Sequence, residues 1–243
     1  MKKQFFLILI LFSAGAVFAS GFSLSTGAGG LFGYTFTRYT LEGSSISSTQ
    51  NMDRIDYAAF VFIDAKYVEF SVMFKGGYST WEENLIYDQN DPEGSSGGRG
   101  TGTETSVGFS LIGKYPFTVN ESLIWFPMLG VEYHIALMQR RQPQGGFIYD
   151  RTSGMLAEDQ DKDGDSYPLS AWNSFWINLG AGADYSISSR FFIRSELLFG
   201  FRLPTAYENG ALEVIKKMGA NNPRLAGLTG SPMLKIGVGY NIF

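Results

Sequence analysis

The chain holds 243 residues, of which 17% are charged and 16% are aromatic, and its formal net charge is −4. It contains 30 glycines and no cysteine, which excludes disulfides, thiolate chemistry and zinc–thiolate sites. The acidic balance, without basic clusters interleaved with aromatic residues, argues against nucleic-acid binding.

The first residues have the features of a secretory signal peptide. Lys2 and Lys3 form a basic region, residues 5–12 form an apolar core, and residues 17–19 provide small side chains for cleavage. The apolar run is too short to span a membrane as a helix. We expect cleavage after Ala19, which leaves a barrel domain over residues 20–243. No cysteine lies near this position, so a lipid anchor is not expected.

After this segment, apolar residues alternate with small or polar residues in eight stretches. This period of two places successive side chains on opposite faces of a β-strand. No stretch approaches the roughly 20 consecutive apolar residues of a helical membrane span. The predicted strands cover about residues 21–41, 54–64, 67–82, 103–115, 122–140, 172–187, 191–203 and 231–243.

The last stretch shows the alternation most clearly. Its apolar face holds Leu234, Ile236, Val238, Tyr240 and Ile242. Its other face holds Lys235, Gly237, Gly239 and Asn241. A continuous apolar face opposite a small or polar one suits a barrel wall with lipid outside and a crowded polar interior. A soluble barrel would have the reverse arrangement, but the bulky apolar face and the long strands favour lipid outside.

The connections alternate in length. Short turns are expected near residues 64–66, 116–121 and 188–190, and longer polar loops at 42–52, 88–102, 141–170 and 204–230. Transmembrane barrels combine short periplasmic turns with longer external loops. The sequence therefore predicts an all-β protein of the bacterial outer membrane, an eight-stranded antiparallel up-and-down transmembrane β-barrel that is a monomer. Its last strand must pair with its first, because unpaired amides in lipid cost several kcal/mol each.

Charged residues on the polar faces of the predicted strands should point into the lumen. They are Glu69, Lys75, Lys114, Glu132, His134, Asp184, Arg194, Glu196, Arg202 and Lys235. An eight-stranded barrel is only wide enough for side chains to fill, and a buried charge must be paired or solvated. Two interpretations stay open. The charges form a salt-bridged plug that blocks flow, or they line a narrow pore.

His134 is the only histidine and lies two residues after Glu132 on the same face. A barrel hydrolase or acyltransferase would need a nucleophile beside this histidine. The sequence places no serine against it. We therefore expect His134 to be an ordinary lumen or rim residue, and we expect no enzymatic activity.

An acidic motif lies in the longest predicted loop. Asp159, Asp161, Asp163 and Asp165, with Gly164 at the sixth position, match the start of a calcium-binding loop. The twelfth position is Ser170 instead of glutamate, and strands replace the usual flanking helices. Weak Ca²⁺ binding by an external loop and a merely solvated acidic loop both remain open. No other cofactor is expected.

Aromatic residues near the strand ends are expected to form girdles at the two membrane interfaces. One group is Tyr115, Phe117 and Trp125, and the other is Tyr78, Trp81, Phe147, Tyr149 and Trp172.

The end of the chain resembles the terminal strand that the bacterial barrel-assembly machinery recognises. In the usual signal, a C-terminal phenylalanine shares a face with a tyrosine two positions earlier. Here Tyr240 lies three positions before Phe243 and shares a face with Ile242 instead. Residues 60–69 and 113–117 resemble segments of small spirochaetal outer-membrane barrels, some of which are similar to the OmpW family.

This resemblance implies a narrow pore or a lateral conduit for small hydrophobic molecules. The alternative is a non-transporting barrel whose external loops bind a surface partner or which maintains the envelope. The expected partners are outer-membrane lipid, the assembly machinery, and either a small hydrophobic solute or that surface partner.

Overall fold

The structure is a computed structural model that describes residues 23–42, 47–86, 95–144, 169–206, 208–209 and 224–242. The predicted signal peptide, the acidic motif and Phe243 lie outside these ranges. The strands are β1 (Ser25–Glu42), β2 (Ser47–Asp64), β3 (Val68–Ile86), β4 (Ser95–Lys114), β5 (Phe117–Asn120), β6 (Leu123–Gln144), β7 (Ser174–Ser186), β8 (Phe191–Arg202) and β9 (Arg224–Asn241). A short 3-10 helix, η3 (Leu169–Trp172), precedes β7. No helix within the described residues has the length and hydropathy of a membrane span.

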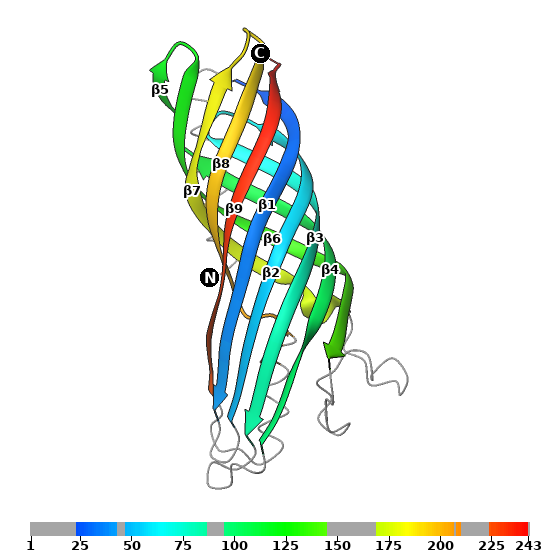
Figure 1. Ribbon diagram of the computed structural model, residues 1–243. Coiled ribbons are helices and arrows are strands. Elements are labelled where there is room, and N and C mark those ends of the chain that lie inside the picture. Colours follow the sequence, from blue (N-terminus) through cyan, green and yellow to red (C-terminus); the bar gives the residue numbers. More distant parts are fainter. Residues whose placement is uncertain are drawn as a thin grey trace.

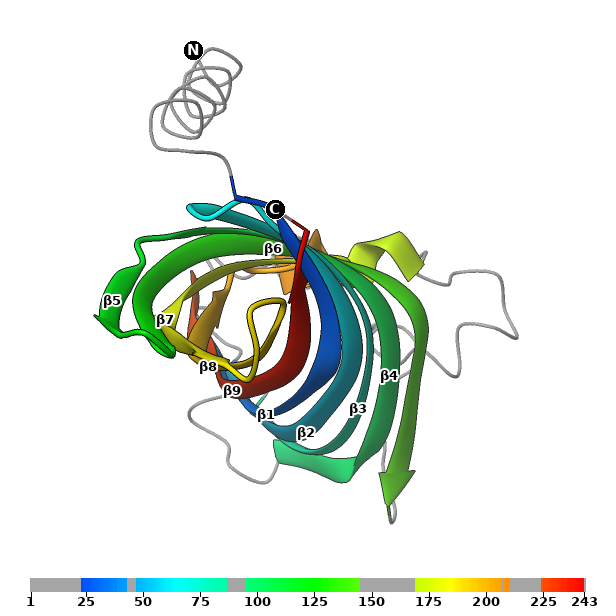
Figure 2. The same cartoon turned by 90° about the horizontal axis from the view of Figure 1, so that it is seen from above.

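The strands form one closed antiparallel sheet. Strands that follow one another in the chain pair, except that β4 and β5 both pair with β6, and β1 pairs with β9 from Ser25↔Asn241 to Glu42↔Arg224. Figure 1 shows β9 in red beside β1 in blue, and Figure 2 shows the ring of strands around a central lumen. The predicted eight-stranded up-and-down barrel is confirmed, including the pairing of its first and last strands.

The additional strand, β5, is a continuation of β4 after a break. Lys114 lies opposite Met128 and Phe117 lies opposite Trp125, so the register is the same on both sides of the break. Pro116 and Pro127 lie within the interrupted part, and neither has an N–H group to donate to the ladder. The prediction of a simple turn over residues 116–121 is therefore wrong, because the hairpin continues to Asn120. Figure 1 shows β5 projecting past the rim.

The two ends of the barrel differ. At one end, here called the turn end, Ala65–Tyr67 and Ile187–Arg190 connect adjacent strands, and Ser23 and Ile242 lie there. At the other end, here called the loop end, the connections are residues 43–46, 87–94, 145–173 and 203–223. The predicted alternation of short and long connections is present except between β1 and β2, where residues 43–46 form a connection no longer than Ile187–Arg190.

The burial pattern is the reverse of that in a water-soluble protein. Leu197 and Leu129 on the outer face are 66% and 63% exposed, whereas Arg194 and Glu69 on the inner face are 2% and 1% exposed. Exposing a large apolar side chain to water costs about 1.5–3 kcal/mol, and burying an unpaired charge costs more. An exposed apolar outer face, with the charged side chains enclosed on the inner face, becomes favourable when hydrocarbon surrounds the barrel. The outer face is therefore a lipid-facing surface.

Several strands are longer than predicted at the loop end. β2 begins at Ser47, β4 at Ser95 and β9 at Arg224, inside segments predicted as loops at 42–52, 88–102 and 204–230. In these parts neither face has a continuous row of apolar side chains, so the alternation that marks a lipid-facing strand is lost. The backbone ladder continues because it depends on amide pairing and not on side-chain polarity.

Trp81 is not part of an interfacial girdle, contrary to the prediction. It lies on the inner face of β3 and is only 3% exposed, and its indole Nε1–H donates to the Thr101 carbonyl at 3.2 Å. Gly100 lies directly opposite on β4 and has no side chain to displace the ring. Tyr78 and Trp125 do lie exposed on the outer face.

Inward glycines on β1 and β9 leave space for rings from the neighbouring strands β2 and β8. A Cβ atom on Gly239 would lie 2.0 Å from Cζ of Phe192, and one on Gly27 would lie 2.4 Å from Cζ of Phe62. These distances are far below van der Waals contact. At the seam between β1 and β9, the inner face therefore has no side chains at these positions, and the barrel wall is thinner there.

Gly29 and Gly30 provide a matched test of this seam. A Cβ atom on Gly29 would lie 2.2 Å from the Ile236 carbonyl oxygen, whereas the nearest atom to one on the outward Gly30 is 3.8 Å away. We expect Gly29→Val to lower the free energy of unfolding by about 1–3 kcal/mol or more through overpacking, and Gly30→Val to leave it nearly unchanged. Urea unfolding in detergent micelles and heat-modifiable gel migration measure the difference. Equal losses in both variants would contradict the packing argument.

Candidate functional site

The charged residues predicted to face the lumen all lie on the inner face of the barrel. Eight of them are buried: Glu69, Lys75, Lys114, Glu132, His134, Arg194, Glu196 and Lys235. Asp184 and Arg202 are partly buried. Side-chain contacts divide these residues into groups at successive levels between the turn end and the loop end.

The group nearest the turn end is centred on Arg194 of β8. Its Nη2 lies 2.5 Å from Asp64 Oδ2, its Nη1 lies 2.5 Å from Glu69 Oε2, and its Nε and Nη2 lie 2.7 and 2.6 Å from the two Asp184 oxygens. Lys114 of β4 also pairs with Asp64 and lies 4.0 Å from Glu69. We call these five residues the turn-end cluster. Because they come from β2, β3, β4, β7 and β8, the cluster spans the lumen.

Aromatic rings enclose the turn-end cluster. The Arg194 guanidinium carbon lies 4.7, 5.1 and 5.3 Å from the ring centroids of Phe62, Phe192 and Phe126. Lys114 Nζ lies 4.4 Å from the Phe126 centroid. Desolvated cations gain about 2 kcal/mol from such ring faces, which offsets part of the cost of burial. Between this cluster and the turn-end mouth, the open space has a volume of about 120 Å³.

Glu196 and Lys235 occupy the middle of the lumen. They are directly opposite each other on β8 and β9, and each is 1% exposed. Neither carboxylate oxygen of Glu196 nor the Lys235 ammonium has a hydrogen-bond partner among the described residues. Arg194 Nε lies 4.0 Å from Glu196, and Lys235 Nζ lies 5.5 Å from the Phe60 ring centroid. The two side chains form no direct ion pair with each other.

Glu132 and His134 form the next group. His134 Nε2 contacts Glu132 Oε1, and the Asn178 amide donates to Glu132 Oε2 at 3.1 Å. The His134 ring centroid lies 6.2 Å from that of Trp176. Within the described part of the chain, no serine hydroxyl is hydrogen-bonded to His134.

Arg54 and Asp56 form the centre of a group near the loop end. Arg54 Nε lies 2.7 Å from Asp56 Oδ1, and its Nη1 contacts Glu104. Asp56 also accepts from the Thr35 hydroxyl at 2.5 Å and lies 3.5 Å from Lys75 Nζ. This group again joins side chains from four strands, β1 to β4.

Arg202 lies beyond this group, at the loop-end mouth. It pairs with Glu208 and donates to the hydroxyls of Tyr39 and Thr229 at 3.3 and 3.2 Å. Thr229 also contacts Thr37 at 3.0 Å.

Sequence reasoning missed several members of these groups: Arg54, Asp56, Asp64, Glu104 and Glu208. Arg54 and Asp56 alternate with the outward Ile55 and Tyr57, so the period-two pattern already assigns them to the lumen. Asp64 was assigned to a turn, although it lies two residues after the inward Phe62. Glu208 lies in a predicted loop and carries no such signal.

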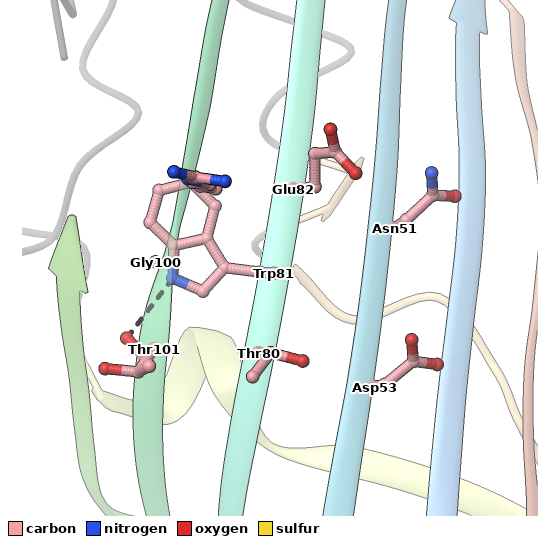
Figure 3. Close-up of a pocket in the computed structure, with 8 residues that line it drawn as sticks. Asn51, Asp53, Thr80, Trp81, Glu82, Gly100 and Thr101 are labelled. Carbon is pink, nitrogen blue, oxygen red and sulfur yellow. Dashed lines mark hydrogen bonds between the residues drawn. The ribbon is translucent and has the colours of Figure 1, made fainter. Parts of the chain in front are cut away.

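A second polar site lies on the outside of the barrel, near the loop end. It is an open pocket of about 500 Å³ on β2, β3 and β4. Its outward side chains are Asn51, Asp53, Thr80, Glu82, Arg99 and Thr101, with Trp81 and Gly100 behind them. Figure 3 shows Glu82 beside Asn51 in one row and Thr80 beside Asp53 in the next. We call this the outer pocket.

Some predicted site residues are not described. Asp159, Asp161, Asp163, Asp165 and Phe243 lie outside the described residues. Among the residues that are described, no group of three His, Asp or Glu side chains is arranged to hold a metal ion. Tyr240 lies on β9, where its hydroxyl accepts from Arg190 at 3.1 Å and its ring packs edge-on against Phe191.

A closed antiparallel barrel with an apolar outer face and ion pairs inside defines a transmembrane β-barrel of the bacterial outer-membrane type. No family model and no curated relative matches the sequence.

Solved outer-membrane proteins do share similarity with the chain. Neisserial surface protein A is 14% identical, with 87% of this chain and 96% of that one covered and a TM-score of 0.31. OprG from Pseudomonas aeruginosa is 12% identical, with 89% and 96% covered and a TM-score of 0.34. The outer membrane protease OmpT from Escherichia coli is 9% identical, with 93% and 100% covered and a TM-score of 0.32. Strand register and side-chain burial define the fold of this chain.

Arg194 should be essential for stability. In Arg194→Met, the carboxylates of Asp64, Glu69 and Asp184 would lose the guanidinium that they share, and Lys114 pairs only with Asp64 and Glu69. Breaking a buried ion pair by removing one partner costs about 3–5 kcal/mol, so we expect a large fall in the midpoint of urea unfolding.

Two further variants make this test specific. Arg190→Met removes an exposed arginine at the turn end and should change the midpoint little. Adding Asp64→Asn and Glu69→Gln to Arg194→Met should restore part of the loss, because the uncompensated charges are removed. An unchanged midpoint in Arg194→Met would show that the cluster does not hold the barrel together.

Proposed function

We propose that this protein is a non-conducting outer-membrane barrel whose function is carried by its outer surface and loop end. The observation that carries this proposal is the turn-end cluster. Arg194 fills the space between side chains of four other strands, with carboxylates on β2, β3 and β7 and aromatic rings on β2, β6 and β8 itself. An ion crossing the lumen would have to break several buried ion pairs at once, at a cost of several kcal/mol each.

The orientation that we propose places the loop end outside the cell. Barrels of this type have short turns on the periplasmic side and longer connections on the external side. The polar ends of β1 to β4 would then rise above the outer leaflet. Export by the predicted signal peptide and insertion by the assembly machinery, through the strand that contains Tyr240, would lead to this orientation.

We also propose that the protein has no catalytic role. His134 is 2% exposed and lies between Glu132 and Trp176, so a lipid or peptide substrate has no route to it. Its Nε2 contacts Glu132, which also accepts from the Asn178 amide. Loss of a lipid or peptide turnover in His134→Ala would overturn this view.

Planar-bilayer recordings test the non-conducting lumen. Folded wild-type protein should give no discrete openings. Asp64→Asn combined with Arg194→Gln removes little side-chain volume from the cluster and should also be silent, whereas Phe62→Ala combined with Arg194→Ala removes much more and should open a small channel. Each variant is first checked for heat-modifiable migration. Reproducible openings of the wild-type protein would favour a pore instead.

A lateral conduit for small hydrophobic molecules is the second candidate. β7 and β8 hold 13 and 12 residues, whereas the flanking β6 and β9 hold 22 and 18. Within the described residues, β6 beyond His134 has no strand on its β7 side, and β9 before Thr229 has none on its β8 side. The barrel wall is therefore shorter at the loop end of β7 and β8. A solute that enters from the loop end could leave sideways into lipid there, before it reaches the turn-end cluster.

Uptake of a fluorescent hydrophobic probe tests the conduit. Cells that express the wild-type protein should take up N-phenylnaphthylamine faster than cells that express the seam variant Gly29→Val at the same level, because only a closed barrel offers the path. Equal uptake by the two kinds of cell, with the wild-type barrel folded in the outer membrane, would contradict the conduit, and only the surface function would remain.

A further inference from the structure

The outer pocket contains one internally satisfied ion pair. Arg38 of β1 donates from Nη2 to Asp53 at 2.7 Å and from Nη1 to the carbonyls of Thr37 and Met52 at 2.9 and 3.0 Å. Asp53 also accepts from the Tyr34 hydroxyl at 2.8 Å. The charge of Asp53 is therefore neutralised by a neighbour that is itself held in place.

Glu82 and Arg99 differ from this pair. They are directly opposite each other on β3 and β4, on the outer face, where opposed side chains are near enough to interact. Neither has a hydrogen-bond or ion-pair partner among the described residues. The outer pocket thus offers one free carboxylate and one free guanidinium on neighbouring strands, with Asn51 opposite Glu82 on the other side. A ligand that matches both needs one anionic and one cationic group.

The position of the pocket narrows the class of ligand. The next row of outward residues toward the turn end is Tyr34, Ile55 and Tyr78, which are 43%, 49% and 50% exposed. Tyr57 and Phe74 continue this apolar strip along β2 and β3. The free charges therefore lie at the boundary between the lipid-facing surface and the polar part of the wall, where lipid headgroups are found.

We propose that the outer pocket binds the phosphoethanolamine headgroup of a zwitterionic phospholipid. Arg99 binds the phosphate, for which the planar guanidinium is well suited, and Glu82 with Asn51 accepts hydrogen bonds from the ammonium group. The acyl chains lie along Ile55, Tyr57 and Phe74. This assignment does not depend on whether the lumen conducts.

Native mass spectrometry of the full-length mature barrel, refolded in detergent with equimolar phosphatidylethanolamine and phosphatidylglycerol, tests the proposal. The wild-type protein should retain the zwitterionic lipid roughly three- to fivefold more than the anionic one, the effect of one ion pair at a surface. Glu82→Gln should bring this ratio close to one, because it removes the negative charge that attracts the ammonium group and repels an anionic headgroup. Arg99→Gln should lower retention of both lipids.

Glu121→Gln is the matched control, since it makes the same charge change in an exposed turn at the opposite end of the barrel. It should leave the ratio unchanged.

Glycerophosphoethanolamine, which has no acyl chains, should fail to displace the lipid at equal concentration. Equal displacement would assign the pocket to a soluble headgroup and overturn the lipid assignment. A wild-type ratio of one, or a ratio that Glu82→Gln leaves unchanged, would overturn the proposal as a whole.

Discussion

The peptide backbone is the constraint on which the rest of this structure depends. Hydrocarbon offers no hydrogen-bond partner to an amide, so each N–H and C=O within the membrane must pair inside the protein. The antiparallel ladder satisfies this requirement only because β9 pairs with β1 and β4 pairs with β6, which closes the sheet. Inward glycines at the β1–β9 seam allow the two strands to approach while rings from β2 and β8 fill the lumen beside them.

Closure of the barrel also determines which side chains meet in its interior. Period-two alternation sends every second residue inward, and the lumen of a small barrel is narrow enough that charged side chains must meet. Arg194 therefore binds carboxylates from strands far away in the sequence, with Asp64 on β2 and Glu69 on β3. These pairs couple opposite sides of the barrel, so the plug and the stability of the wall have the same physical origin.

Alternation in the sequence predicts the strands only where lipid lies on one side. Ile55 to Ile63 could be assigned to a face because every outward residue is apolar, although Phe60 and Phe62 on the inner face are apolar as well. Near Ser95 and Ser47 both faces are polar or small, and the strands were interpreted as loops. For the same reason, the outer pocket could not be found from the sequence, since Arg99 lies in such a segment. The inward face of Arg194 was predictable, but its partners depend on the level of each side chain along the barrel axis.

The pairing of β1 with β9 has a kinetic consequence. The two strands that seal the cylinder are the first and the last to be synthesised, so the contact has the largest sequence separation in the fold. Folding slows when loop closure must precede the contacts that reward it. Until β9 arrives, β1 presents a long row of unsatisfied amides that other chains could pair with. Membrane insertion and the pairing of β1 with β9 must therefore be nearly simultaneous. Keeping the unpaired chain from aggregating in the aqueous compartment becomes the most difficult step in the assembly of this protein.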